Sequence, residues 1–367
     1  MRRITVGVDP PYAVTVGAGA LDELPTLLDP YRRVVVVTQP RIHELFGGAL
    51  DAISRIGTGP WVDGPWVETM GDGESAKSLS TIESLCRAFA AGGLLRGDVV
   101  VALGGGVVGD TAGFAAAVYH RGIDVVQVPT TLLAQVDSAI GGKTAVNLTE
   151  GKNLVGAFHQ PVAVVSDTAT LAPLPNAEYR CGLGEVAKYA LMPEGTALID
   201  LLRLDLDRVL ERDAGVLADL VAMCTEIKAA VVAADPQERT GVRAALNFGH
   251  TFAHALETSS SSVNDAQPLA HGEAVAIGLI FDVRLAHALE RVGLDAVDRV
   301  HGVVAGLGLP VAVPCDVGRE ELLAVMRRDK KAAGGLTFVL PGPDGLTVVH
   351  DPPAHALDIA FESVGVP

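Results

Sequence analysis

Three histidines, His250, His254 and His271, are the residues of this sequence best suited to binding a metal ion. His250 and His254 are four residues apart in a stretch with helix-forming composition, so one helix face presents both imidazoles about one turn apart. His271 begins a second helical pattern. Imidazole nitrogens from two helices and a carboxylate would make a three-ligand site with an open position, the catalytic type of zinc site. The alternative is a pair of partly exposed helix residues, because the Glu of a His-Glu-x-x-His peptidase helix is absent.

Glu185 is a candidate for the carboxylate of that site. Glu185 and Lys188 are three residues apart and so lie on one helix face. The flanking Ala, Val and Leu residues indicate that this face is buried, where an isolated charge is costly. The alternative is a surface ion pair that contributes less than ~1 kcal/mol to stability.

A glycine-rich turn at residues 104–109 is typical of a dinucleotide site. Gly104, Gly106 and Gly109 satisfy G-x-G-x-x-G, with a predicted strand before them and a helical pattern after them. Bare backbone N–H groups and the positive end of the helix would hold a pyrophosphate. The acidic residue expected about 20 residues later is missing, and the segment 71–77, with Asp72 and Glu74, is its candidate replacement. The alternative is a tight turn that packs a helix on a strand.

The lysines are scarce and lie in motif-like surroundings. There are seven lysines among 28 basic residues, which leaves 21 arginines. Lys143 and Lys152 each follow a glycine, so backbone and ammonium can both approach a phosphate or carboxylate. Asp137 stands where a Walker A loop needs a glycine, which disfavours nucleoside triphosphate chemistry.

The elements that position these residues divide the chain into two halves. Residues 33–38, 98–103 and 123–128 are short apolar runs typical of buried parallel strands, and residues 77–92 and 111–119 are helical patterns between or after them. Strand–helix alternation predicts a parallel sheet covered on both faces. From residue 176 helical stretches dominate, at 178–191, 214–234 and 273–292, followed by one apolar run at 336–341. We therefore expect an α/β, Rossmann-like domain over 1–175 and a mainly α-helical domain over 176–367, with the active site in the cleft between them.

Composition excludes several classes of partner. The formal net charge is −16, so the surface repels nucleic acid and anionic lipid. No apolar run reaches the ~20 residues of a membrane helix, and the N-terminus lacks a signal-peptide pattern. Four dispersed cysteines without a Cys-x-x-Cys pair indicate reduced thiols. We expect a cytoplasmic enzyme that concentrates cations around an anionic metabolite.

These motifs, taken in order, resemble the 3-dehydroquinate synthase family of sugar phosphate cyclases over residues 68–341. The resemblance implies a dehydroquinate synthase-like fold and an NAD- and metal-dependent conversion of 3-deoxy-D-arabino-heptulosonate 7-phosphate to 3-dehydroquinate and phosphate in the shikimate pathway. The matching segments are 71–77, 104–110, 129–131, 136–153, 184–188, 247–254, 271–273 and 329–331.

The resemblance also assigns roles to individual residues. It implies that Glu185, His250 and His271 bind Zn²⁺ or Co²⁺, whereas His254 faces the phosphate. The other implied phosphate ligands are Lys143, Asn153, Asn247 and Lys330, with Arg121 reaching across a homodimer interface. The residues implied to hold the carboxylate and hydroxyls are Lys188, Lys228 and Arg243. The implied NAD contacts are Asp72, Gly73, Glu74, Ser75, Ala76, Lys77, Gly104, Gly105, Gly106, Val107, Val108, Gly109, Asp110, Thr130, Thr131, Lys143, Lys152, Thr170, Leu171, Ala172 and Pro173. Two positions depart from the pattern of this family: Gln39 stands where the family usually has Asp, and Pro173 stands where it usually has Thr.

The expected chemistry suits these residue types. A metal ion that chelates two hydroxyls favours hydride transfer to NAD, and the resulting ketone permits β-elimination of phosphate. Return of the hydride and an intramolecular aldol reaction then close the ring. Asp137 and Lys188 are candidates for moving protons. One rival hypothesis is another sugar phosphate cyclase, and another is a non-catalytic NAD-binding protein. A third is a metal-dependent polyol dehydrogenase of the same fold, which would not need four lysines together, namely Lys143, Lys152, Lys188 and Lys228.

Overall fold

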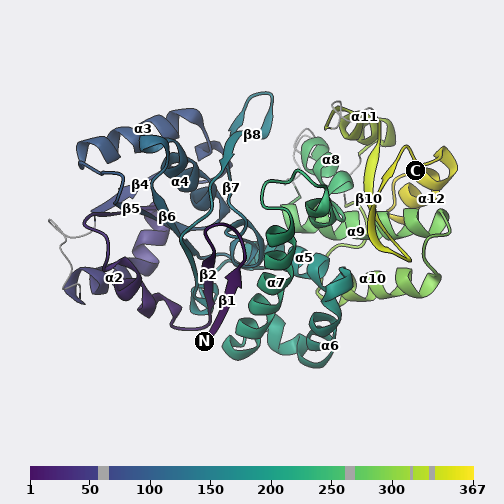
Figure 1. Cartoon of the computed structure of the whole chain (residues 1–367). Coiled ribbons are helices and arrows are strands. Elements are labelled where there is room, and N and C mark those ends of the chain that lie inside the picture. Colours follow the sequence, from purple (N-terminus) through teal and green to yellow (C-terminus); the bar gives the residue numbers. More distant parts are fainter. Residues whose placement is uncertain (57–65, 261–268, 315–316, 330–334) are drawn as a thin grey trace. The chain divides into compact units, whose positions relative to one another are not determined.

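The computed structural model describes residues 1–56, 66–260, 269–314, 317–329 and 335–367 (Figure 1). The chain forms two compact units. The first consists of Met1–Leu174 and Arg212–Gln237, and the second of Pro175–Glu211 and Glu238–Pro367. The first unit thus includes a segment, Arg212–Gln237, that lies beyond the boundary expected at residue 175. Of the residues described, no helix has both the length and the apolar character needed to cross a membrane.

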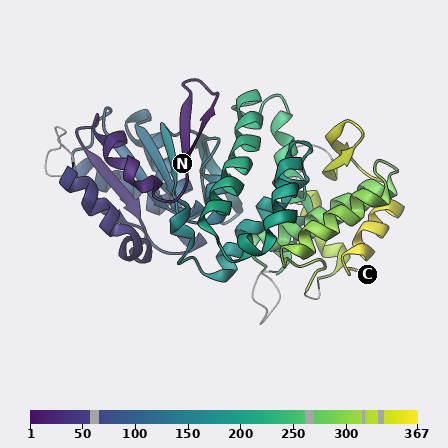
Figure 2. The ribbon, with the colours of Figure 1, turned by 90° about the horizontal axis from the view of Figure 1, so that it is seen from below.

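The first unit is built on a seven-stranded sheet (Figures 1 and 2). Its order is β1 (Arg2–Val6), β2 (Tyr12–Val16), β9 (Ala163–Ser166), β6 (Asp124–Pro129), β5 (Val99–Gly104), β3 (Val34–Thr38) and β4 (Trp66–Thr69). The β1–β2 pair is antiparallel and the other pairs are parallel. The three apolar runs predicted as buried parallel strands are β3, β5 and β6.

Both faces of this sheet are buried, which explains why its central strands are mostly apolar. Val35 and Val100 pair in register and face helices α3 (Leu79–Ala91) and α4 (Gly106–Val118). Val36 and Val101 pair one residue further on and pack on the opposite face, with α1 (Leu24–Leu28) and α2 (Pro40–Ile56). Alternate side chains of a strand point to opposite faces, so each strand contributes to two hydrophobic cores.

Two further elements of the first unit carry candidate residues. A hairpin of β7 (Lys143–Leu148) and β8 (Gly151–Phe158) holds both Gly-Lys pairs, in a stretch where no strand was predicted. Helix α7 spans Ala214–Ala234, and the residue before it, Asp213, caps its N-terminus. The Asp213 carboxylate accepts hydrogen bonds from the N–H groups of Gly215 and Val216. It packs against β1 and against the turn Ala134–Ser138.

The second unit is mainly helical, as predicted. Helix α9 (His271–Ala288) lies at its centre and contacts α5 (Asn176–Leu191), α8 (His250–Ser260), α10 (Leu294–Gly306), α12 (Ala354–Ser363) and β10 (Thr337–Gly342). Phe252, Phe281, Phe338 and Phe361 form the aromatic core around it. The apolar run at 336–341 is β10, which pairs with β11 (Gly345–His350). Among the described residues of this unit, the remaining α-helices are α6 (Thr196–Leu210) and α11 (Arg319–Asp329).

Candidate functional site

Glu185, His250 and His271 converge in the second unit. One donor atom from each lies within 4.8 Å of the others, the group that the described residues offer for a metal ion. The Glu185 Oε1 atom is 3.3 Å from His250 Nε2 and 3.3 Å from His271 Nε2. Ligands held about 2.0–2.2 Å from a tetrahedral ion are separated by about 3.3–3.6 Å, so this spacing fits a zinc-sized ion. Two imidazoles and a carboxylate also leave a fourth position for water or substrate.

Glycines let helices α5 and α9 approach closely enough to bring Glu185 and His271 together. Gly184 and Gly272 lie where α5 crosses α9. A Cβ atom on Gly184 would be 2.1 Å from the Gly272 carbonyl oxygen, and one on Gly272 would be 1.8 Å from the Cys181 carbonyl oxygen. Each glycine adjoins a ligand, Glu185 or His271. The absence of side chains at this crossing therefore sets the distance between those two ligands.

The turn before His250 is fixed in a similar way. Gly249 has φ +81°, a left-handed backbone conformation that residues other than glycine rarely adopt. Its N–H donates to the buried carboxylate of Asp282 on α9 at 2.8 Å. A Cβ on Gly278 of α9 would be 1.9 Å from the Gly249 carbonyl oxygen. The start of α8 is thus tied to α9, which positions His250 beside His271.

Both histidines have an acceptor at the nitrogen that faces away from the cluster. His250 Nδ1 is 3.1 Å from the Phe248 carbonyl oxygen, and His271 Nδ1 is 3.2 Å from Glu257 Oε2. An N–H at Nδ1 that donates to an oxygen leaves the Nε2 lone pair free, the tautomer needed to bind a metal. The donor set therefore fits a divalent ion in its chemistry as well as in its spacing.

Lys188 lies beside Glu185, and its positive charge keeps this carboxylate ionised. Its Nζ atom is 2.5 Å from Glu185 Oε2, and both side chains are only 1% exposed. Burial alone would raise the pKa of Glu185, but Lys188 and His250 hold that pKa well below its ordinary value. Burial lowers the pKa of His250 against the opposing effect of Glu185, so this imidazole is neutral at neutral pH. Burial opposes the protonation of His271, yet its hydrogen bonds to Glu185 and Glu257 raise its pKa to about 10.

The other candidate residues of the second unit lie near the start of α8. His254 is exposed on α8, and its ring centroid is 5.6 Å from that of His250. The side chain of His254 is not one of the three that converge. Arg243 is 1% exposed in the short helix Val242–Asn247, which ends at Asn247 three residues before His250. Lys330 lies outside the described residues.

The glycine turn of the first unit has the predicted surroundings, a strand before it and a helix after it. It joins β5 to α4. A Cβ on Gly105 would be 3.0 Å from the Thr131 side chain, and one on Gly106 would be 3.1 Å from Ser138. The Thr130 N–H donates to the Gly104 carbonyl oxygen at 3.0 Å. Thr130 and Thr131 therefore border the turn, where N–H groups at the start of α4 can meet an anion.

Lys77 links three of the candidate segments. Its ammonium group is 2.7 Å from Asp110 Oδ2 on α4 and 2.7 Å from Asn153 Oδ1 on the hairpin. Asn147 of β7 donates from its side chain to Glu74 Oε1 at 2.8 Å. Burial raises the pKa of Asp110 above its ordinary value, although Lys77 opposes this effect. Lys77 is 5% exposed and so positions the segment 72–77 and the hairpin beside the glycine turn.

The remaining candidates of the first unit lie in three places. The Lys228 ammonium group on α7 is 2.9 Å from Asp137 Oδ1 and donates to the Asp137 carbonyl oxygen at 2.7 Å. Thr170 accepts a hydrogen bond from the buried Gln135 side chain, which also donates to the Pro129 carbonyl oxygen. Exposed positions are occupied by Lys143, Lys152, Arg121, Ala172 and Pro173.

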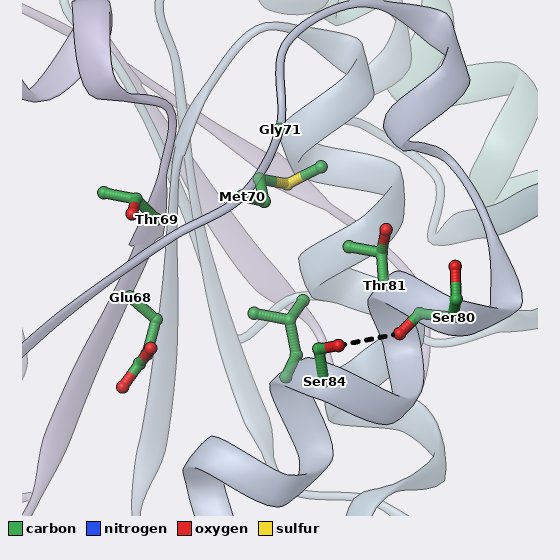
Figure 3. Close-up of a pocket in the computed structure, with 8 residues that line it drawn as sticks. Glu68, Thr69, Met70, Gly71, Ser80, Thr81 and Ser84 are labelled. Carbon is green, nitrogen blue, oxygen red and sulfur yellow. Dashed lines mark hydrogen bonds between the residues drawn. The ribbon is translucent and has the colours of Figure 1, made fainter.

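A cavity of about 290 Å³ lies at the end of β4, beside the start of the segment 71–77 (Figure 3). Its walls include Glu68, Thr69, Met70 and Gly71 on one side and hydroxyl groups of α3 on the other. Gln39, at the end of β3, donates to the Gly71 carbonyl oxygen at 3.2 Å. None of the metal-site residues lines this cavity.

Sequence reasoning missed two groups that shape these sites. Glu257 orients His271, and Asp282 anchors the turn before His250. A signal for Glu257 was present, because it lies seven residues, or two helical turns, after His250 and so on the same face of α8.

Comparison with known proteins gives matches along most of the chain. Residues 67–181 match the family described as 3-dehydroquinate synthase N-terminal, and residues 182–332 match the one described as 3-dehydroquinate synthase C-terminal. The 3-dehydroquinate synthase of Caulobacter vibrioides is 44% identical over 354 residues, which cover 93% of this chain and 92% of that protein. A protein of Amycolatopsis mediterranei, provisionally named an aminodehydroquinate synthase, is 45% identical over 350 residues, which cover 94% of this chain and 89% of that protein.

A solved structure shares the fold of most of the chain. The 2-epi-5-epi-valiolone synthase of Streptomyces hygroscopicus subsp. jinggangensis, solved with NAD⁺ and Zn²⁺ bound, superposes with a TM-score of 0.83. It is 28% identical, with 96% of each chain covered. The predicted fold class, an α/β Rossmann-like domain followed by a helical one, is thereby confirmed.

Proposed function

The chain belongs to the 3-dehydroquinate synthase family, and from this premise we propose that it is an NAD- and divalent-metal-dependent sugar phosphate cyclase. The observation that carries the proposal is the convergence of Glu185, His250 and His271, in which Glu185 Oε1 lies 3.3 Å from the Nε2 atom of each histidine. The glycine turn between β5 and α4 supports dinucleotide binding. The relative solved with NAD⁺ and Zn²⁺ supports the same pair of cofactors.

We further propose that the substrate is 3-deoxy-D-arabino-heptulosonate 7-phosphate and the products are 3-dehydroquinate and phosphate, a step of the shikimate pathway. The 44% identical 3-dehydroquinate synthase supports this assignment. A second candidate is the amino analogue of that substrate, in which an amine replaces a hydroxyl group. The protein of Amycolatopsis mediterranei provisionally named an aminodehydroquinate synthase supports it, because it is 45% identical to this chain. Both substrates carry a carboxylate, for which the buried Arg243 guanidinium is the candidate partner.

The chain's own residues would bind and orient this substrate. When bound, the metal ion acidifies neighbouring hydroxyl groups, and the dinucleotide accepts and returns a hydride. We assign the metal to Glu185, His250 and His271, and the pyrophosphate to the N–H groups at the start of α4. Lys143 and Asn153 on the hairpin, with Asn247 and His254, would hold the substrate phosphate. Asp137, which pairs with Lys228, and Lys188, which pairs with Glu185, would be the groups that move protons.

The cavity at the end of β4 is the candidate for the adenosine end of the dinucleotide. It adjoins Gly71, where the aligned segment begins, and Gln39, which replaces the usual Asp. A glutamine amide that donates to Gly71 cannot act as a carboxylate toward ribose hydroxyls. The hydroxyl groups of Ser80 and Thr81 offer alternative partners (Figure 3).

Substrate assays with the purified protein distinguish these assignments. We expect phosphate release from the heptulosonate phosphate that needs NAD but produces no steady accumulation of NADH, and that stops with chelator and returns with Zn²⁺ or Co²⁺. The kcat/KM for the amino analogue should be lower by tenfold or more, about 1.4 kcal/mol in transition-state binding. The reverse ranking would assign the second candidate. NADH accumulation without phosphate release would indicate a polyol dehydrogenase instead.

Metal binding should release close to one proton at neutral pH. The raised pKa of His271, about 10, means that this imidazole carries an extra proton in the metal-free protein, and a metal ion can bind only the neutral form. The apparent affinity for Zn²⁺ should therefore rise about tenfold per pH unit between roughly pH 7 and 9. Calorimetry in buffers of different ionisation enthalpy measures the released protons. A binding enthalpy independent of the buffer would contradict the prediction.

A further inference from the structure

Helix α8 supplies both a ligand and the support of another ligand. His250 and Glu257 are seven residues apart, two helical turns, so both side chains face α9. Glu257 Oε2 lies 3.2 Å from His271 Nδ1, and its side chain is 15% exposed. His271 is therefore held between two carboxylates, with Glu185 at Nε2 and Glu257 at Nδ1.

The two histidines have different supports. His250 Nδ1 faces the neutral carbonyl oxygen of Phe248, whereas His271 Nδ1 faces a carboxylate. A backbone carbonyl fixes the tautomer and orientation of a histidine and makes the opposite ring nitrogen somewhat more basic. A carboxylate has the same effects, but its full negative charge increases the basicity more and so strengthens the bond to a metal further.

The charges around the cluster explain why a carboxylate is needed. Lys188 lies 2.5 Å from Glu185 and offsets the negative charge of this ligand at a position where water is excluded. Glu185 and Lys188 together carry no net charge, so the ammonium group weakens the attraction of this carboxylate for a dication. Glu257 restores one negative charge next to the third ligand.

We propose that Glu257 is a positioning residue for the metal centre, which orients His271 through a hydrogen bond and compensates the charge of Lys188. This inference rests on the proposed function, because it presumes that Glu185, His250 and His271 bind a divalent ion. It assigns two separable effects to one side chain: the hydrogen bond, which an amide can replace, and the charge, which it cannot.

The test compares Glu257→Gln and Glu257→Ala by competition for Zn²⁺ against a chromophoric chelator at several pH values, so that each affinity is corrected for the proton that His271 loses on binding, and by the visible absorption of the Co²⁺-loaded protein. Glu257→Ala should weaken Zn²⁺ binding by about 10- to 100-fold and alter the Co²⁺ spectrum, because His271 loses its orientation. Glu257→Gln should retain the Co²⁺ spectrum but still lose several-fold in Zn²⁺ affinity. The matched control is Glu290→Gln, which removes an equal charge at an exposed position beyond the other end of α9.

Each outcome bears on one claim. Zn²⁺ binding by folded Glu257→Ala that stays within twofold of the unaltered protein would overturn the inference while leaving the proposed function intact. Equal losses in Glu257→Gln and Glu290→Gln would overturn the local role of the charge. Failure of the unaltered protein to bind Zn²⁺ or Co²⁺ would instead reject the proposed metal centre itself. Circular dichroism identifies variants that have unfolded, and in that case Glu257→Gln alone decides.

Discussion

Glu185→Gln is expected to abolish both metal binding and turnover, lowering kcat/KM by about a thousandfold or more, equivalent to ~4 kcal/mol. The substitution removes the anionic ligand that lies 3.3 Å from both histidine nitrogens. It also removes the carboxylate that lies 2.5 Å from the ammonium group of Lys188, a side chain that is 1% exposed. Breaking a buried ion pair by neutralising one member is unfavourable, so the free energy of unfolding should fall by about 3 kcal/mol as well.

Metal content after dialysis, phosphate release and denaturant unfolding measure these effects separately. The matched control is Glu178→Gln, an exposed position in the first turn of the same helix, which should change none of them beyond about 0.5 kcal/mol. A Glu185→Gln protein that retains one equivalent of Zn²⁺ and near-normal turnover would exclude Glu185 as a ligand.

The second large effect is expected from Gly272→Ala. The new Cβ atom would lie 1.8 Å from the Cys181 carbonyl oxygen, and backbone atoms on both sides cannot move aside as a flexible side chain could. Helices α5 and α9 must therefore separate, which moves Glu185 away from His271. We expect a loss of about 3 kcal/mol or more in unfolding free energy and a loss of Zn²⁺ affinity of at least tenfold.

Gly302→Ala on α10 is the control for that substitution. A Cβ there has no atom within 4 Å, so alanine should be neutral or stabilise the helix by up to about 1 kcal/mol. Urea unfolding of both variants, with Zn²⁺ titration, provides the comparison. If Gly272→Ala matched Gly302→Ala in both measurements, the close helix crossing would not determine the geometry of the ligands.

Much of the fold could be predicted because local patterns and tertiary packing agree. The runs that became β3, β5 and β6 are apolar at successive positions, since each strand packs helices on both faces. The pairing of β10 with β11 could not be predicted in the same way. Residues 345–350 are only partly buried, so their sequence lacks a strong hydrophobic pattern.

The metal cluster was only partly visible in the sequence. Spacing alone placed His250 and His254 on one helix, and both do lie on α8, but it could not tell which of them points toward α9. That choice depends on the Gly249 turn and its hydrogen bond to Asp282, contacts made across 33 residues of chain. The role of Lys77 was hidden for the same reason, because its partners Asp110 and Asn153 are 33 and 76 residues away.

The return of Arg212–Gln237 to the first unit has a consequence for any attempt to dissect the protein. The polypeptide passes from one unit to the other at three points, so a single cut cannot yield two complete halves. A gene fragment ending at residue 175 would encode a sheet without the helix that packs on β1, and with Asp137 deprived of Lys228. Recombinant halves should therefore be designed by circular rearrangement or by co-expression of the four segments that these three crossings define.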